Sequence, residues 1–148
     1  MRINYRIVVL LFPFLFLLAI PVFGSSDWVE YYTDDHENVS SCRIVTADRE
    51  GGNYIVQVWV REVLSEKGRE KYIQDRAAKK LSTEGYKNLS SIKSLSEIDC
   101  KKKQIMTLAV LSFDASGKKL DAYYVDQLKW VRISNNSSFN ALRKEVCK

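Results

Sequence analysis

Residues 103–125 read KQIMTLAVLSFDASGKKLDAYYV, and this stretch decides the fold class. The part from Lys103 to Phe113 is long and apolar, which predicts a strand of a buried sheet. Asp114-Ala-Ser-Gly117 predicts a hairpin turn, with Gly117 at the position that needs a positive φ. Leu120 to Val125 predicts a strand that runs back beside the first. Strands joined by a tight turn are antiparallel, so the stretch predicts an antiparallel sheet.

The segments on either side of this hairpin predict further strands of the same sheet. The clearest runs from Tyr54 to Val60, where the even positions are all apolar and the odd positions mix Ile55 and Trp59 with Gln57. This alternation predicts one face in the core and the other at least half covered. The remaining β-prone segments are Trp28–Thr33, Cys42–Thr46, Tyr86–Ile98 and Trp130–Ile133.

Residues 69–81 change to a helical period and predict a short helix laid on the sheet. Asp75 precedes Lys79 by four residues, which favours an ion pair along the helix. Gly85 suits the exit of this helix. The apolar positions that recur every four residues are Ile73, Ala77 and Leu81.

A second helix is predicted at the C-terminus. Ser137 or Ser138 can cap its first turn. Phe139, Leu142 and Val146 would then fall on one apolar face, which would press the end of the helix toward the sheet.

Strands joined by turns, with two helices inserted, predict the α+β class: a single, mostly antiparallel β-sheet of about five to seven strands, with a short inserted helix and a C-terminal helix packed on it. Without residues 1–24 the chain of 148 keeps 124 residues. That length suits one domain that buries about two-thirds of its unfolded surface. We therefore expect residues 25–148 to form a single domain.

Residues 1–24 have the three parts of a cleavable secretory signal. Arg2 and Arg6 supply the positive start, the 17 residues from Ile7 to Phe23 the apolar run, and Gly24 the small residue before the cut. The alternative is an uncleaved anchor, because the run approaches the ~20 residues that span a bilayer. The prolines within the run, Pro13 and Pro21, favour cleavage.

The exported chain would be mildly basic. Losing Arg2 and Arg6 lowers the net charge from +5 to +3, which is short of the concentrated charge of nucleic-acid-binding domains. The three tryptophans lie in strand patterns that bury rings, so we expect no nucleic-acid partner. No later segment is long and apolar enough to cross a membrane, so we expect the cleaved chain not to be integral to one. Its expected location is the periplasm or the outer cell surface.

The three cysteines, Cys42, Cys100 and Cys147, all lie in the exported part. Outside the cytoplasm two of them should pair and one is left over, and three pairings are open. The unpaired thiol is either buried and inert or joins a second chain in a homodimer.

The order of short motifs resembles the bacterial surface-adhesin protein E family. The C-terminal half carries Asp99-Cys100 followed by a basic cluster, then the long strand and the Asp114–Gly117 hairpin. Trp130-Val-Arg-Ile133 and a Ser-started helix ending in Val146-Cys147 complete it. The matching features of the N-terminal half are Trp28, Asp34-Asp35 and Val58-Trp59-Val60.

The resemblance implies a small antiparallel sheet with helices and a bridge between Cys100 and Cys147. It also implies a role in holding host or matrix proteins. The chain departs from the family pattern at Asn135-Asn136, where the family commonly has a proline, and at Cys42, which has no counterpart there.

The residues offer little for catalysis or for a metal. The only histidine is His36, inside Asp34-Asp-His-Glu37, and no second histidine or cysteine stands at ligand spacing, so a solvated acidic loop is preferred to a metal site. There is no Gly-x-Ser-x-Gly elbow and no phosphate-binding glycine loop. The one conceivable nucleophile is the thiol of Cys42, with the imidazole of His36 as its base. We expect no catalytic residues, no metal and no cofactor.

Lys101, Lys102 and Lys103 form the densest charge run and are the candidate site for an anionic partner. The alternative is a solvated strand start, whose lysines deter pairing between sheet edges. If these lysines and the basic side of helix 69–81 lay on one face, binding of an anionic partner would be favoured.

Together these features predict an exported, non-enzymatic binding protein: a surface adhesin that holds a host, matrix or envelope macromolecule, either protein or glycan. The alternative is a periplasmic domain that is structural, assists assembly or inhibits an enzyme. A small hydrolase built on His36 and Cys42 is the remaining class.

Overall fold

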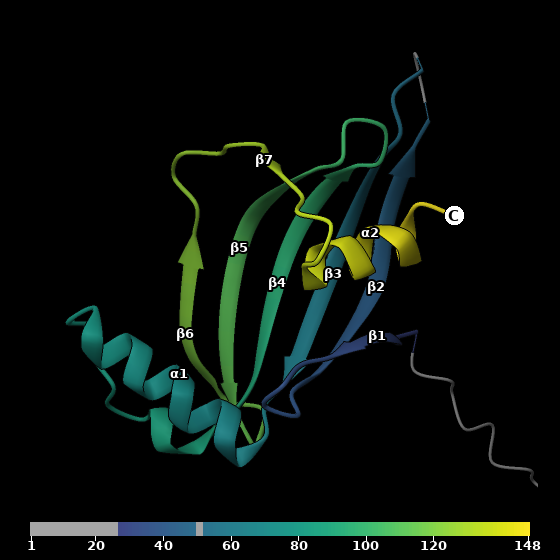
Figure 1. The fold of residues 1–148 in the computed structure, drawn as a ribbon. Helices are drawn as coiled ribbons and strands as arrows, with labels where there is room; N and C mark the ends of the chain where they lie inside the picture. The colour runs from purple at the N-terminus through teal and green to yellow at the C-terminus, as the bar shows by residue number, and fades with distance from the viewer. Residues whose placement is uncertain (1–26, 50–51) are drawn as a thin grey trace, which may run out of the picture.

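The structure is a computed structural model that describes residues 27–49 and 52–148 (Figure 1). The predicted signal, residues 1–24, lies outside the described residues.

A seven-stranded antiparallel sheet forms the body of the described chain. Its first six strands lie in the order β1-β2-β3-β4-β5-β6, and β7 pairs with the first two residues of β5. Each of the first six strands neighbours the next in sequence, so short turns suffice to connect most of them. This confirms the predicted α+β class. The strands are β1 Val29–Thr33, β2 Val39–Asp48, β3 Ile55–Val63, β4 Leu89–Asp99, β5 Gln104–Asp114, β6 Lys119–Tyr124 and β7 Val131–Arg132.

The inserted helix exists, but the predicted limits, 69–81, are wrong. Helix α1 spans Glu66–Ala78, because the hydroxyl of Ser65 accepts a hydrogen bond from the Gly68 amide (2.9 Å) and caps the first turn. Lys80 has a left-handed φ of 58° just past its end. Leu81, expected on the apolar face, therefore lies outside the helix with 50% of its surface exposed.

Two local features around α1 differ from the prediction. Asp75 forms a close ion pair with Lys71, one turn before it, and the charge of Lys79 adds a smaller attraction to the same carboxylate, whose pKa both lysines lower. Gly85 does not end the helix; it precedes a 3₁₀ turn, Tyr86–Asn88, which occupies the first residues of the predicted strand 86–98. Strand β4 consequently begins at Leu89.

The core lies between the sheet and the C-terminal helix α2, Ser138–Val146. Val56, Val58, Ile98 and Ile105 of the sheet are buried in one cluster with Leu142 and Val146 of α2. Ser137 caps this helix, as one of the two predicted serines. Phe139, expected on the buried stripe, is 45% exposed because it sits in the first turn, beyond the cluster.

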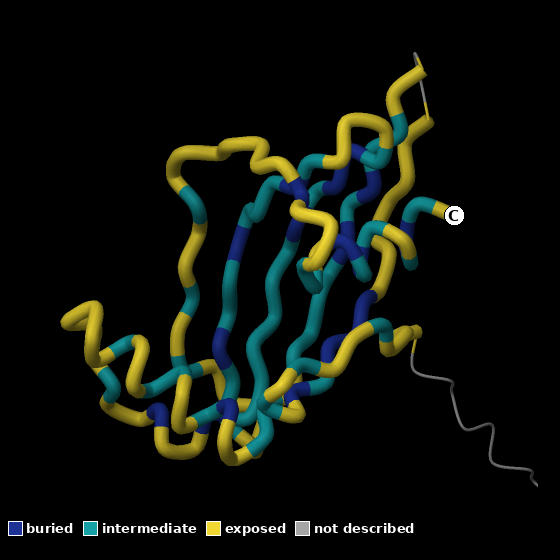
Figure 2. The backbone as a smooth tube through the Cα atoms, viewed as in Figure 1, coloured by how far each residue is buried: buried dark blue, intermediate teal, exposed yellow. Residues whose placement is uncertain are grey.

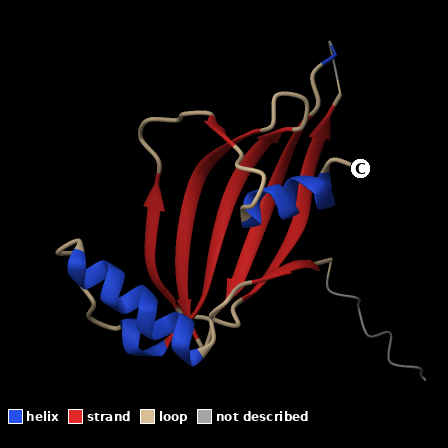
Figure 3. Cartoon of the chain, viewed as in Figure 1, coloured by secondary structure: helices blue, strands red, loops and turns tan. Residues whose placement is uncertain are grey.

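Helix α1 lies on the same side of the sheet, toward one end. Glu62 follows Val56 by six residues along β3, so strand alternation places both on one face. Register pairs lead from Glu62 across the sheet to Asp121 of β6. The Asp121 carboxylate accepts a hydrogen bond from the Tyr86 hydroxyl (2.9 Å) and lies 3.7 Å from the guanidinium of Arg76 in α1. Both helices thus cover one side, the helical face (Figure 3).

A disulfide joins Cys100, at the end of β4, to Cys147, just past α2, as the family resemblance implied. The two residues are 47 positions apart in sequence. The bridge attaches the C-terminal end of α2 to the sheet, and the apolar side chains of α2 pack on that same sheet.

A buried asparagine attaches the start of α1 to the β1–β2 turn. Asn38 accepts a hydrogen bond from the Ser65 amide (2.9 Å) and donates to Asp34 (3.0 Å) and Glu62 (3.2 Å). Gly68 lies against it: a Cβ at this position would stand 1.9 Å from Oδ1 of Asn38. The glycine is therefore required by the close approach of the helix.

Replacing Gly68 with Ala should lower the free energy of unfolding by about 1–3 kcal/mol, because the methyl group displaces Asn38 from its hydrogen bonds. Helix propensity alone would predict a gain of about 1 kcal/mol, so the sign is diagnostic. Urea unfolding of G68A and of the exposed control Q74A measures it. In an N38A background G68A should become neutral or stabilising; an unchanged loss there would contradict the steric explanation.

Replacing both Cys100 and Cys147 with Ser should lower the free energy of unfolding by up to about 4 kcal/mol, because the bridge constrains a long loop of the unfolded chain. Guanidinium unfolding of C100S/C147S beside the oxidised and reduced wild-type protein measures the loss. Equal midpoints for the oxidised protein and the variant would show that the bridge does not stabilise the fold.

Candidate functional site

The side of the sheet opposite the two helices is the candidate functional surface, which we call the open face. Both described helices lie on the helical face, so no helix of residues 27–49 and 52–148 covers this side. Intermediate burial along the central strands accords with a single covered side (Figure 2). A sheet face of this kind either meets solvent or receives a partner.

Strand register arranges the open face in rows that run across the sheet. One row is mainly aromatic and apolar but begins at Arg43, and the neighbouring row contains three charged residues. The first row is Arg43, Trp59, Leu95, Ala109 and Tyr124. The second row is Glu30, Ser41, Arg61, Lys93, Leu111 and Ala122.

Three cations of this face surround one tryptophan. The guanidinium carbons of Arg43 and Arg61 lie 5.3 Å and 4.8 Å from the centroid of the Trp28 ring. The ammonium of Lys93 lies 6.0 Å from the same ring and 4.9 Å from that of Phe113. We call these five residues the cation–aromatic cluster. Each contact is a cation–π interaction, worth about 0.5–1 kcal/mol at an exposed site.

Among the described residues, the cations of the cluster have no carboxylate within ion-pair distance. Arg43, Arg61 and Lys93 are in none of the ion pairs formed within the described part of the chain. Arg61 instead donates to the Ser41 hydroxyl (3.3 Å). The described carboxylates that register places on this face are Glu30, Glu97, Asp48 and Asp99, and Glu97 accepts a hydrogen bond from Gln57 (3.4 Å). Three positive charges are therefore held in place without an ion-pair partner from residues 27–49 or 52–148.

The sequence alone did not identify this cluster. Its five residues come from five different strand regions, and only the register brings Arg43, Arg61 and Lys93 beside Trp28. The alternation of residues 54–60 did indicate a half-covered second face. The expectation that the tryptophans are buried is wrong: Trp28 and Trp59 are half-buried on the open face, and Trp130 is 38% exposed because it sits in a loop.

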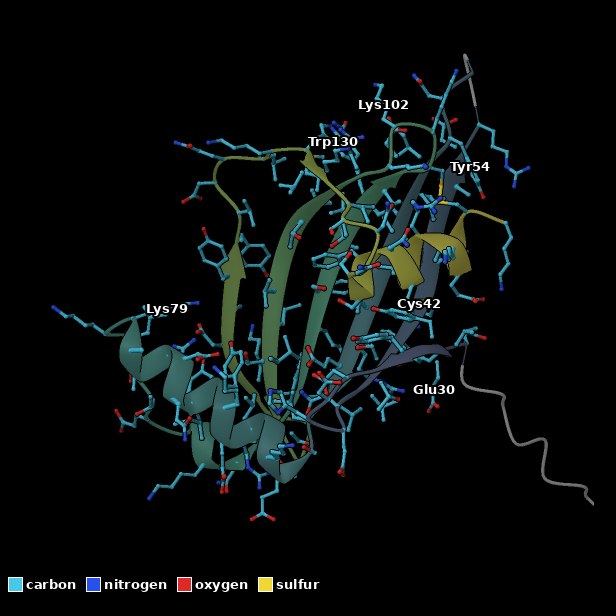
Figure 4. The ribbon with its side chains drawn as sticks, in the orientation of Figure 1. Glu30, Cys42, Tyr54, Lys79, Lys102 and Trp130 are labelled. Atoms are coloured by element: carbon cyan, nitrogen blue, oxygen red, sulfur yellow. A yellow bond between two sulfur atoms is a disulfide. The ribbon has the colours of Figure 1, made fainter. Side chains whose placement is uncertain are left out.

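The predicted lysine site lies at the turn between β4 and β5. Lys102 pairs with Asp99 (3.5 Å), and the Lys101 ammonium donates to the Gly52 carbonyl (3.2 Å). This turn and α1 lie at opposite ends of the sheet, as Lys102 and Lys79 show in Figure 4. The shared basic face that would favour binding is absent, and binding of an anion by Lys101, Lys102 and Lys103 stays a prediction.

His36 and Cys42 have separate surroundings. The Asp34 carboxylate accepts hydrogen bonds from the amides of His36 and Asn38 (both 2.9 Å), so this loop is a hydrogen-bonded turn rather than a fully solvated one. Cys42 is buried in the core cluster beneath α2. Burial, and secondarily the charge of Glu145, raise the pKa of its thiol to about 11. No three potential metal ligands come together among the described residues.

The fold and the candidate surface define a two-layer α+β domain with one layer of helices and one open sheet face. The surface-adhesin protein E family matches residues 28–148, and the chain belongs to this family. No curated protein and no solved structure matches it. Membership supports an adhesin-type role and suggests a non-enzymatic protein at the cell surface. None of the helices described is long and apolar enough to cross a membrane.

Cys42 should react with iodoacetamide far more slowly in the folded protein than in urea, because the buried thiol forms its thiolate only near pH 11. The low reactivity should persist to pH 9. Mass spectrometry after timed alkylation measures it, with S116C in the exposed β5–β6 turn as a reactive control. Alkylation of native Cys42 as fast as that of S116C would contradict its burial.

Proposed function

We propose that the chain is an exported surface adhesin that holds an acidic protein partner on its open face. The observation that carries the proposal is the cation–aromatic cluster, which places three cations on a sheet face that no described helix covers. None of the three forms an ion pair with another described residue. Family membership and the predicted signal at residues 1–24 support the surface location. The disulfide supports export, because such bonds persist outside the reducing cytoplasm.

The composition of the open face favours a protein as partner. Tryptophan, tyrosine and arginine are enriched in protein–protein interfaces and contribute most of their binding energy. The row from Arg43 to Tyr124 crosses five strands, and with Trp28 it reaches β1, so it extends about 24 Å at the usual strand spacing. A patch of that breadth suits a standard interface of about 800 Å² per partner.

The charge of the face favours an acidic partner. Arg43, Arg61 and Lys93 lie on aromatic rings, which leaves their charges accessible at the rim of an apolar strip. Carboxylates of a partner would find their complement there, which accelerates association and fixes orientation more than it adds affinity.

Reversing the three charges, in R43E/R61E/K93E, should weaken binding to an immobilised extracellular-matrix preparation at least tenfold, because the variant repels carboxylates. Surface plasmon resonance measures the affinity, and circular dichroism checks the fold. The matched control K79E/K80E/K144E changes the net charge equally away from the open face and should bind like the wild type. Esterifying the carboxylates of the matrix should abolish binding.

Three outcomes would count against the proposal. The first is the absence of saturable binding at micromolar concentrations, and the second is an equal loss in the control variant. The third is a purely periplasmic location, found by fractionation and by protease treatment of intact cells. This third outcome would favour the periplasmic structural, assembly or inhibitory role instead.

A further inference from the structure

A groove on the other side of the molecule lies between β5, β7, the chain that connects β6 to β7, and the start of α2. Its volume is about 400 Å³. Five of its eleven lining residues are apolar: Ile105, Val125, Val131, Ile133 and Phe139. Small-molecule sites commonly have volumes of about 300–1,000 Å³ and are lined mainly by apolar groups.

The groove exists because two strands share one side of β5 and do not meet. Strand β6 ends where Tyr124 pairs with Ala109, while β7 pairs only with Gln104 and Ile105. Between them the chain of residues 125–130 arches away from β5 (Figure 1). The amide of Val125 still donates to the Leu108 carbonyl (3.0 Å), so the arch begins just past that bond.

Apolar groups beside the groove remain exposed. Val131 is 59% exposed, and Phe139 and Leu128 are exposed as well. Folding of the described chain therefore leaves uncovered apolar surface concentrated at this site. Exposed apolar surface around a concavity indicates a binding site more often than isolated exposed side chains do.

The charged lining of the groove is positive. Lys129 and Arg132 are lining residues, and neither forms an ion pair within the part of the chain that the structure describes. No aspartate or glutamate is among the lining residues; Asp126 belongs to the same connecting chain but lies outside the lining. Ser137, the N-cap of α2, also lines the groove, and the first turn of this helix carries no acidic residue. The positive end of the helix dipole adds to the two side-chain charges.

We propose that this groove binds a single-chain amphipathic anion, an alkyl carboxylate of medium length. The apolar lining would take the alkyl chain, and Lys129 and Arg132 would bind the carboxylate. A cation with the same tail would be repelled, and a carboxylate without a tail would leave the apolar surface uncovered. The site is separate from the open face, because its lining includes Ile105 and Ile133 of the core cluster on the helical side.

Dodecanoate, kept below its micelle concentration, tests the site. Titration of the exported, disulfide-bonded protein, followed by NMR shifts of residues 125–139 and by calorimetry, should give saturable binding. Affinity should rise about three- to fourfold per methylene from octanoate through decanoate to dodecanoate. Dodecyltrimethylammonium and acetate should not bind. Vesicles of anionic phospholipid distinguish a free ligand from a bilayer: binding to vesicles without binding of monomeric dodecanoate would overturn the proposal.

Two variants separate charge from apolar contact. K129A/R132A should weaken dodecanoate binding at least tenfold, and V131D should abolish it. Because all three side chains are exposed, the fold should be retained. K79A/K80A, which removes the same charge from the far end of α1, should bind like the wild type. Absence of saturable dodecanoate binding, equal binding of the cationic analogue, or full affinity in K129A/R132A would each refute the site. None of these outcomes affects the test of the open face.

Discussion

The packing of α2 against the sheet is the contact on which the rest of the structure depends. Leu142 and Val146 complete a cluster whose other members come from β2 to β5 and, at Ile133, from the chain just after β7, so the helix closes the one apolar layer of the described chain. The Cys100–Cys147 bridge fixes the last turn of this helix to the end of β4. A domain of this size has a net stability of only about 5–15 kcal/mol, so a long-range covalent tether is a large part of it.

Placing both helices on one side has a direct consequence for function. The second face of the sheet is then left without a covering helix. If this face presented only half-buried Trp28, Trp59 and Leu95, it would expose a contiguous apolar patch, which favours aggregation. Arginine and lysine side chains resolve this conflict, since their stems cover aromatic rings while their charges stay in water. The cation–aromatic cluster therefore serves the solubility of the free protein and also provides the chemistry for an acidic partner.

The sequence predicted the kinds of elements well and their limits less well. Periods of two and near four separated strands from helices, and Asp114–Gly117 marked the hairpin, whose Gly117 has the expected positive φ of 83°. The limits of α1 were missed because its apolar positions are weak signals, while its true start depends on Ser65 and on contact with Asn38. From the sequence alone Gly68 is an unfavourable residue for a helix, and only its contact with Asn38 explains why a glycine is required there.

What the sequence determined by itself was local: alternation, turn chemistry, the capping serine and the order of motifs that resembles the adhesin family. The tertiary structure alone decided which residues meet. Arg43, Arg61 and Lys93 are far apart in the chain, and the groove beside β7 arises from where two strands stop. The physical reason is that register and layer order are set by burial summed over the whole sheet. A shift of one residue in any strand would move its side chains to the opposite face without changing the local pattern.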